Sequence, residues 1–330
     1  MSYVYLLTSG SIAKKDNQRL LIEKNNSIIA SIPFNDVECV IVNEGCNITT
    51  PVIDILLNHK KCIFFVDFSG HLRGSLTPAN ISNYQFKRQI EVMDEKNYQT
   101  ILAQNTIKEK LLNQRQLLKN ISKQKKLPSL NTYTNTIKTI TKSLMHEKNV
   151  DTMRGLEGIA AKEYFDAFKV ILANTGWNWL GRSRRPAKDK VNALLNYGYA
   201  FLERETRLAI VATNLDPRIG FLHCNNGKKD SLVFDLMELF RQPIIDRFIM
   251  NIINRKQISP DHIKKNKQYG YILDETIKAT WIHLYESYME KPLQSLEGMS
   301  PREYIRNTVK NFSYKISKLA NSTTEREALI

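Results

Sequence analysis

The sequence predicts an α+β protein in which an amino-terminal β-sandwich-like domain precedes a larger all-α domain. Short β-branched runs separated by turn residues fill the first part of the chain, and long stretches with apolar residues at helical spacing follow. At 330 residues the chain is long enough for two domains with separate cores. We expect a β-rich domain over 1–80, a linker over 81–96, a helical domain over 97–320 and a flexible tail over 321–330.

The first domain is expected to contain short strands and one helix. Turn residues at 24–26 and 33–36 separate its apolar runs. Thr50 and Pro51 suit the cap and the first position of a helix, since proline lacks only an N–H that has no partner there. The expected strands cover 4–7, 19–23, 27–32, 37–42, 62–66 and 72–76.

The second domain is expected to begin with a long helix from Asn97 to Gln124, where apolar residues recur at helical spacing. The polar, threonine-rich stretch 129–143 favours a loop or a weak helix. Ser300, with Pro301 and Glu303, forms a capping box for the last helix. The remaining expected helices cover 157–173, 191–212, 231–255, 274–289 and 301–319.

The positive charge of the chain lies outside the first domain. The net charge is +15, and residues 1–80 hold seven basic and seven acidic side chains, whereas residues 81–330 hold 41 basic and 26 acidic ones. This distribution assigns any binding of a polyanion to the second domain. The alternative is a charged surface that only keeps the protein in solution.

The chain shows no signal of secretion or of membrane insertion. No apolar run approaches the ~20 residues of a membrane span, and the first residues lack the pattern of a signal sequence. The cysteines form no CxxC pair and lie mostly in apolar runs, which is typical of buried thiols in a reducing compartment. We therefore expect a cytoplasmic protein with no membrane partner. The cysteines are Cys39, Cys46, Cys62 and Cys224.

Three acidic residues and one histidine are the candidates for chemistry. Asp235 and Glu238 stand three positions apart in an apolar stretch, so a helix would place both on one face, where buried carboxylates need a cation. Glu157 precedes an apolar helical stretch and is either a residue stabilised by the helix dipole or a buried ligand. His223, taken alone, is more typical of a hydrogen-bonded core imidazole than of a ligand.

Oxygen donors with one imidazole suit Mg²⁺ or Mn²⁺, and a structural zinc site would need more Cys or His than the chain offers. Such a metal can polarise a phosphodiester and stabilise an attacking oxygen. The residues therefore indicate a metal-dependent site that acts on nucleic acid.

Basic residues surround these candidates in the sequence. Arginine forks suit phosphate oxygens and hold nucleic acid without reading its sequence, although a solvated loop would look the same. Trp177 and Trp179, which stand beside the basic loop of residues 182–188, are more typical of a core than of base stacking. The expected nucleic-acid-binding residues are Arg182, Arg184, Arg185, Lys188, Lys228, Lys229 and Arg241, and further basic residues extend to Lys267.

Four motifs, in this order, resemble those of the universal CRISPR-associated adaptation endonuclease, the integrase subunit of spacer acquisition. The resemblance is strongest over residues 150–250, and the order of the domains extends it to the whole chain. The motifs are Gly155-Leu156-Glu157-Gly158, Arg185-Pro186-x-x-Asp189-x-x-Asn192, Gly220-Phe221-Leu222-His223 and Ser231-Leu232-x-x-Asp235-Leu236-x-Glu238.

The resemblance implies a homodimer with an amino-terminal β-sandwich used for dimerisation and partner contact, and a helical catalytic domain. It implies catalytic roles for Glu157, His223, Asp235 and Glu238, and metal ligands at Glu157, His223 and Glu238. Relatives carry either Asp or Glu at the last position, so either Asp235 or Glu238 can be the direct ligand.

The resemblance also implies an activity and partners. The activity is metal-dependent transesterification, in which the 3′-hydroxyl of prespacer DNA attacks the phosphodiester at the leader–repeat junction of a CRISPR array. The protein partner is the small ferredoxin-like second CRISPR adaptation protein.

The residues by themselves leave two alternatives open. One is a non-catalytic nucleic-acid-binding scaffold in which the acids pair with internal Lys or Arg. The other is a metal-dependent nuclease, such as a ribonuclease, without a role in integration.

Overall fold

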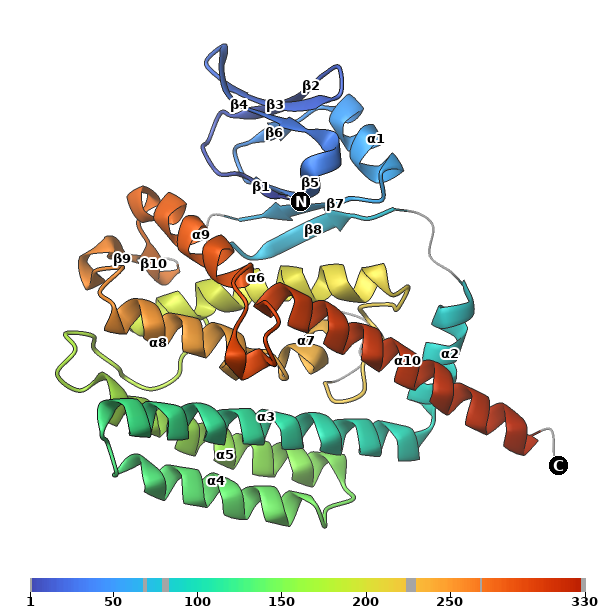
Figure 1. Cartoon of the computed structure of the whole chain (residues 1–330), viewed down its shortest axis with the longest axis vertical. Coiled ribbons are helices and arrows are strands. Elements are labelled where there is room, and N and C mark those ends of the chain that lie inside the picture. Colours follow the sequence, from blue (N-terminus) through green and yellow to red (C-terminus); the bar gives the residue numbers. More distant parts are fainter. Residues whose placement is uncertain (1, 68–69, 79–82, 224–229, 268, 328–330) are drawn as a thin grey trace. The chain divides into compact units, whose positions relative to one another are not determined.

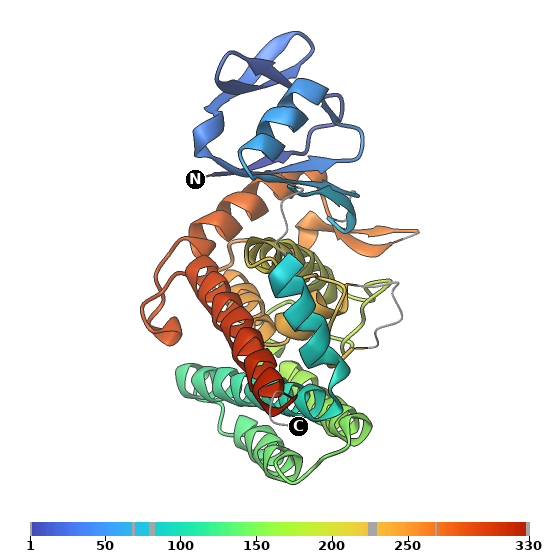
Figure 2. The ribbon, with the colours of Figure 1, turned by 90° about the vertical axis from the view of Figure 1, so that its right-hand side faces the viewer.

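The computed structural model describes residues 2–67, 70–78, 83–223, 230–267 and 269–327. The chain divides into two compact units, Met1–Ser82 and Asn83–Ile330. The first unit carries two sheets and the second is mainly helical (Figures 1 and 2). The predicted mixture of an amino-terminal sheet region and a helical carboxy-terminal part is therefore confirmed.

Two four-stranded sheets build the first unit. The first sheet has the order β1-β5-β7-β8, in which β1 pairs with β5 and β5 with β7 in parallel, while β8 is antiparallel to β7. Parallel neighbours need a crossover between them, and the intervening chain supplies it. The strands of this sheet are β1 (Ser2–Leu6), β5 (Val37–Asn43), β7 (Cys62–Val66) and β8 (Leu72–Leu76).

The second sheet has the order β4-β3-β2-β6. Apolar side chains from both sheets and from α1 (Thr50–Asn58) form one buried cluster, to which Leu6, Leu20 and Val52 belong. The short helix Phe34–Asp36 precedes β5. The strands of this sheet are β2 (Ile12–Asp16), β3 (Arg19–Lys24), β4 (Ser27–Pro33) and β6 (Asn47–Ile48); sequence analysis missed β2 and β6.

The second unit contains most of the helices. Helices α3, α4 and α5 pack against one another, and α6 packs against α7, α8 and α10 (Figures 1 and 2). Most side chains of α6 are buried, so this helix lies within the core. The helices are α2 (Asn83–Asp94), α3 (Lys96–Lys125), α4 (Leu130–Leu144), α5 (Val150–Leu172), α6 (Lys190–Ala212), α7 (Ser231–Met237), α8 (Arg247–Asn254), α9 (Glu275–Met289) and α10 (Pro301–Glu327).

A β-hairpin makes the second unit less purely helical than predicted. β9 (Ile263–Asn266) pairs antiparallel with β10 (Gly270–Leu273). Short 3₁₀ helices cover Pro260–His262 and Gln294–Leu296. The expectation of an all-α domain was wrong here, because only the outer residues Ile263 and Leu273 of the paired strands are buried and the apolar pattern is too short to detect.

The stretch 81–96, expected to be a linker, belongs to the second unit from Asn83 onward. Helix α2 occupies most of it, and the Gln89 side chain is fully buried. Gln89 Nε2 donates to the carbonyls of Asp216 and Ile219, and Gln89 Oε1 accepts from Asp216 N at 2.7 Å. A polar side chain satisfied by a distant turn gives no apolar signal in the sequence.

The threonine-rich stretch 129–143, expected to be a loop or a weak helix, is the regular helix α4. The hydroxyls of Thr136, Thr139 and Thr141 donate to carbonyls four residues earlier, which satisfies them inside the helix. Its buried side chains recur at helical spacing and are Leu130, Thr134, Ile137, Ile140 and Leu144.

The predicted helix over 231–255 is interrupted between α7 and α8 by a π-helical turn, Arg241–Asp246. Pro243 lies in this turn, and its missing N–H prevents a regular hydrogen-bond ladder. Glu238 therefore ends α7 rather than continuing it. At the end of the chain, helix α10 runs on to Glu327, so most of the expected flexible tail over 321–330 is helical.

Trp177 and Trp179 are buried, as predicted, and Trp179 packs against Phe165 and Phe168. No helix in the described part of the chain is long and apolar enough to cross a membrane.

Candidate functional site

The carboxylates of Glu157 and Glu238 meet at the ammonium group of Lys110. Lys110 comes from the middle of α3, Glu157 from α5 and Glu238 from the end of α7. Lys110 Nζ forms an ion pair with Glu157 Oε1 and lies 2.6 Å from Glu238 Oε2. The three side chains are 9%, 17% and 4% exposed, respectively. Three distant parts of the sequence thus converge on one buried cation, which sequence analysis missed.

A second cation, Arg241, lies on the other oxygen of Glu238. Its Nε is 3.3 Å from Glu238 Oε1, and its guanidinium stacks over the Tyr199 ring, 4.7 Å from the centroid. Burial opposes the ionisation of Glu238, but Arg241 and Lys110 outweigh it and lower the pKa of Glu238 to about 2. Burial likewise opposes the charge of Lys110, and the two glutamates outweigh it and raise its pKa. Glu238, Lys110 and Arg241 are therefore charged near neutral pH.

Asp235 holds the turn that carries His223. Its carboxylate is fully buried; Oδ2 accepts hydrogen bonds from the backbone N–H groups of Phe221 and Leu222, and Oδ1 accepts one from that of His223. Asp235 Oδ1 also lies 2.5 Å from His223 Nδ1. The imidazole is thus oriented through Nδ1, which leaves Nε2 for another partner.

The expectation that Asp235 and Glu238 work from one helix face needs a correction. Asp235 Oδ1 and Oδ2 face the turn of residues 221–223, whereas Glu238 faces Lys110 and Arg241. The two acids therefore act on different partners, because α7 ends between them. His223, whose side chain is 43% exposed, is still close enough to lower the pKa of Glu238 further.

Two hydrogen bonds tie the acid-bearing segments together. Arg154, one turn before Glu157 on α5, donates from Nε to the carbonyl of Leu222 at 2.9 Å. Asn113, one turn after Lys110 on α3, donates from Nδ2 to the carbonyl of Leu239 at 3.1 Å. Each of these two helices thus carries one site residue and one residue that hydrogen-bonds to the backbone beside a further site residue. We call Arg154 and Asn113 the clamps. Sequence analysis missed both clamps, since neither residue type is unusual in a helix.

A buried aspartate lies behind the site. Asp246 accepts hydrogen bonds from the hydroxyls of Tyr164 at 2.8 Å and Tyr199 at 2.6 Å. Burial raises the pKa of Asp246 to about 6, although these two hydrogen bonds and the charges of Arg182 and Arg241 oppose the shift. The ring of Tyr199 lies beneath both arginines. This network links the basic loop to Arg241 and hence to Glu238.

The basic residues expected to bind nucleic acid fall into three groups. Arg184, Arg185 and Lys188 are exposed. Arg182 and Arg241 have internal partners: Arg182 Nη1 donates to Asn192 Oδ1 at 2.9 Å, and burial lowers its pKa. Contact of these residues with nucleic acid stays a prediction. Lys228 and Lys229 lie outside the described residues.

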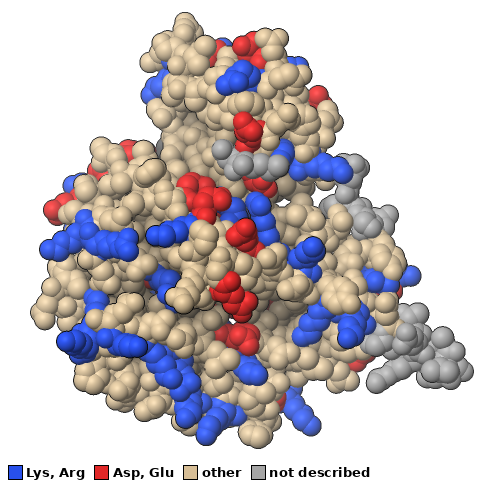
Figure 3. Space-filling view, viewed as in Figure 1, with Lys and Arg blue, Asp and Glu red and all other residues tan. Residues whose placement is uncertain are grey.

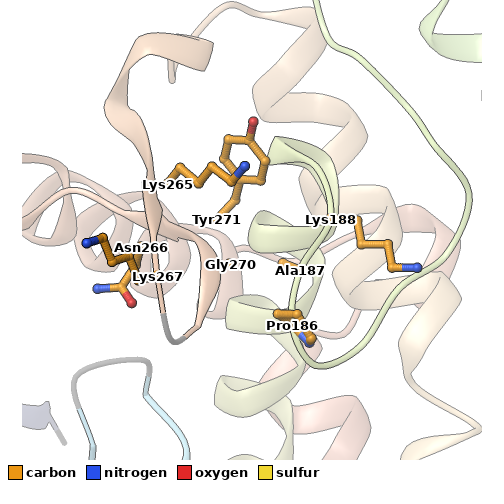
Figure 4. A pocket seen from close by; sticks show the side chains of 8 residues that line it. All are labelled: Pro186, Ala187, Lys188, Lys265, Asn266, Lys267, Gly270 and Tyr271. Carbon is orange, nitrogen blue, oxygen red and sulfur yellow. The ribbon is translucent and has the colours of Figure 1, made fainter.

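The basic loop joins the β9–β10 hairpin. Tyr271 N donates to the carbonyl of Ala187 at 3.0 Å, and Gly270 is needed beside it, because a Cβ there would lie 2.3 Å from Ala187 O. Lys265 and Tyr271 are cross-strand partners on one face of the hairpin. A cavity of about 460 Å³ lies at this junction (Figure 4); Pro186, Ala187, Lys188, Lys265, Asn266, Lys267, Gly270 and Tyr271 line it.

Lysine and arginine side chains are not confined to this junction. On the face shown in Figure 3 they also gather over α3 and α4. The helical unit thus offers a broad cationic surface, and its charge alone does not single out one binding path.

The carboxylates of Glu157 and Glu238 and the imidazole of His223 suit a hard divalent ion, although Lys110 Nζ lies between the two glutamates in this structure. In the described ranges no three His, Cys, Asp or Glu side chains are close enough to form a metal cluster as they stand. Glu238 Oε2 is buried and, despite its ion pair with Lys110, receives no well-directed hydrogen bond from a described group. His223 has the carboxylate partner on Nδ1 that metal-bound histidines commonly have. Two carboxylates and one imidazole fit Mn²⁺ or Mg²⁺.

The two-sheet amino-terminal unit and the helical unit with its acid–histidine site define the class of CRISPR-associated proteins that the motifs resemble. The family model described as "CRISPR associated protein Cas1" matches residues 4–287. The chain belongs to this family.

Two relatives match this chain along most of its length. The chain is 30% identical to "CRISPR-associated protein Cas1 3" of Methanobrevibacter ruminantium, over 77% of this chain and 78% of the relative. It is 28% identical to "CRISPR-associated endonuclease Cas1 1" of Archaeoglobus fulgidus, over 82% of this chain and 84% of the relative.

Solved structures share the fold. A Cas1 protein from Thermotoga maritima has a TM-score of 0.80 at 25% identity and covers 96% of this chain, which in turn covers 97% of it. A casposase bound to integration product has a TM-score of 0.83 at 21% identity, with coverages of 96% and 91%, and shows likeness of fold alone.

Gly220→Ala should disrupt the His223 turn. A Cβ at this position would lie 2.4 Å from Asp235 Oδ2 and 2.8 Å from the Ser231 backbone, so the turn and Asp235 would have to separate. We expect a loss of stability of roughly 1–3 kcal/mol, measured by chemical denaturation. Gly158→Ala, where a Cβ meets nothing within 4 Å, is the matched control. Equal stability of both variants would contradict this account of the turn.

Replacing Asp246 by Asn should change how stability depends on pH. Folding raises the pKa of Asp246 from 3.8 to about 6, so ionising this carboxyl destabilises the folded state; the effect is absent below about pH 4 and complete above about pH 6. Relative to Asp246→Asn, the wild-type free energy of unfolding should therefore fall by about 3 kcal/mol between pH 4 and pH 7. Denaturation across this range measures it, with the exposed Asp36→Asn as control. A difference that does not vary with pH would contradict the assignment.

Proposed function

We propose that this protein is a metal-dependent DNA endonuclease and integrase that inserts prespacer DNA into a CRISPR array. Membership of the Cas1 family and the endonuclease named among its relatives support this proposal. The observation that carries it is the convergence of Glu157 and Glu238 on one cation, near an imidazole held by a buried aspartate.

Glu157, Glu238 and His223 would hold the metal. Bound there, Mg²⁺ or Mn²⁺ would supply Lewis acidity for a phosphodiester and for an attacking oxygen. Asp235 is a positioning residue: it fixes the Nδ1 side of His223 and keeps the turn in place. Arg241 holds Glu238 ionised from the side opposite Lys110.

The proposed reaction exchanges one phosphodiester for another. The 3′-oxygen of the prespacer forms a bond to phosphorus, and the bond from that phosphorus to the 3′-oxygen of the leader strand breaks. The proton of the attacking hydroxyl passes in net terms to the leaving oxygen. With water in place of the prespacer hydroxyl, the same site would cleave DNA.

We propose that the backbone of DNA follows the exposed basic loop and the hairpin. Arg184 and Arg185 are exposed and directly precede Pro186 in the sequence. Pro186 lines the cavity together with Lys188, Lys265 and Lys267 (Figure 4), and no acidic side chain among the described residues lines it. Lysines and arginines without internal acidic partners favour phosphate contacts that position DNA without reading its sequence.

The motif resemblance also supports two protein partners, a second copy of this chain and the small ferredoxin-like second CRISPR adaptation protein. A solved chain titled "Cas6-RT-Cas1--Cas2 complex" shares the fold, with a TM-score of 0.81 at 23% identity, and this chain spans 35% of its length. The location proposed for the assembly is the cytoplasm, where the array lies.

A second candidate is a non-catalytic nucleic-acid-binding scaffold. The observation that favours it is that Lys110 and Arg241 already neutralise Glu157 and Glu238. The two candidates differ in one outcome: only the enzyme cleaves or joins DNA when Mn²⁺ is added. Testing RNA beside branched DNA in the same assay distinguishes a ribonuclease, which would cleave the RNA, from the DNA integrase and from the scaffold.

Glu157→Ala, His223→Ala and Glu238→Ala should each lower strand joining by more than about 100-fold, because each removes one proposed ligand. DNA binding, measured by fluorescence anisotropy, should change little. Glu91→Ala, which removes an exposed carboxylate on α2, is the control and should keep full activity. Strand joining that persists in all three ligand variants would refute the site.

A double variant, Lys265→Gln with Lys267→Gln, should weaken the salt dependence of DNA binding. Each lost phosphate contact lowers the slope of log K against log salt by about 0.9, so the slope should become about 1.8 less steep. The control is Lys15→Gln with Lys60→Gln, two exposed lysines of the neutral amino-terminal unit. If both double variants have the wild-type slope, the hairpin does not contact the backbone.

A further inference from the structure

We propose that Lys110 is an internal counter-cation that competes with the divalent metal for Glu157 and Glu238 and thereby sets the metal affinity of the site. This inference rests on the proposed metal-dependent function. It adds a role for a residue that supplies no ligand atom.

The ammonium group occupies the place where a shared metal would bind. Lys110 Nζ pairs with Glu157 Oε1 and lies 2.6 Å from Glu238 Oε2. A hard divalent ion would approach the same oxygens to roughly 2.0–2.2 Å. Two cations cannot share these oxygens at such distances, so a metal that binds both carboxylates must displace Nζ from at least one.

The backbone of Lys110 cannot make room for the metal. Its neighbours Ile107, Leu111 and Gln114 on α3 are fully buried. Asn113, one turn later, is tied to the carbonyl of Leu239. Only the flexible side chain of Lys110 can therefore move, and its four-carbon stem allows this.

The charges explain two effects of Lys110. Before metal binds, the lysine is needed to neutralise the two glutamates; when metal binds, the lysine competes with it for them. The partly buried carboxylate of Glu157 and the buried carboxylate of Glu238 repel each other unless cations accompany them. Lys110 and Arg241 neutralise the pair, so the site is assembled before metal arrives. A metal then gains less than it would at two uncompensated carboxylates. Lys110 thus keeps the site assembled before metal binds and lowers the affinity of the site for the metal.

The test is calorimetric titration of the full-length protein with MnCl₂ in the absence of DNA. Lys110→Gln should bind Mn²⁺ about tenfold more tightly, or better, because a unit charge at contact distance has gone. Lys110→Arg, which keeps the charge, should stay within about threefold of wild type. Lys119→Gln, exposed on the same helix, is the matched control and should not differ. An unchanged or weaker affinity of Lys110→Gln would overturn the proposal.

Thermal unfolding gives a second readout. Without metal, Lys110→Gln should melt below wild type, because its carboxylates have lost a counter-cation. Saturating Mn²⁺ should raise its melting temperature by more than it raises that of wild type. An equal rise in both proteins would contradict competition.

A double-mutant comparison covers the case in which Lys110→Gln fails to fold without metal. Glu157→Gln leaves one carboxylate and can be compared with Glu157→Gln combined with Lys110→Gln. Competition predicts tighter Mn²⁺ binding by the double variant, and equal binding would overturn it.

The two proposals fail in distinguishable ways. If wild type joins strands with Mn²⁺ but loss of Lys110 leaves the Mn²⁺ affinity unchanged, only the role of Lys110 is wrong. If no form of the protein binds Mn²⁺ or joins strands, the metal-dependent function fails and the inference fails with it.

Discussion

The two ion pairs of Lys110 are the constraint on which the site depends. They hold a glutamate from α5 and a glutamate from the end of α7 on one ammonium group presented by α3. Two carboxylates that converge on one ammonium group, Glu157 at 17% and Glu238 at 4% exposure, are stable there only because cations accompany them. The arrangement therefore fixes how three helices meet, and it leaves carboxylate oxygens converging on a single point in the absence of metal.

The rest of the site is organised around this point. Asp235 uses both oxygens to hold the turn of residues 221–223, and Arg154 fastens the carbonyl of Leu222 to the helix that carries Glu157. His223 is thus positioned by two neighbours, and in the proposed metal site neither of them supplies a ligand atom. Behind it, Asp246 and Tyr199 connect Arg241 to Arg182, so the charge on Glu238 is coupled to the beginning of the basic loop.

The sequence predicted the class of fold and most of the helices, because apolar spacing and capping residues act locally. It also pointed to Asp235 and Glu238, since carboxylates in an apolar stretch need partners, whereas Glu157 and His223 were predicted as ligands through the motif resemblance. It could not distinguish Asp235 from Glu238, because their difference arises where α7 ends. The role of Lys110 could not be predicted, because it is one lysine in a polar helix. The roles of Arg154 and Asn113 could not be predicted either, because their partners are backbone atoms far along the chain. Strand order and the β9–β10 hairpin likewise depend on tertiary packing.

The most direct test of the central claim is a crystal structure of the protein soaked in Mn²⁺, with anomalous scattering used to locate the ion. The account predicts one ion within roughly 2.0–2.2 Å of carboxylate oxygens of Glu157 and Glu238 and of His223 Nε2, with Lys110 Nζ moved off at least one glutamate. A saturated crystal in which Lys110 still bridges both carboxylates and the ion lies elsewhere would contradict it.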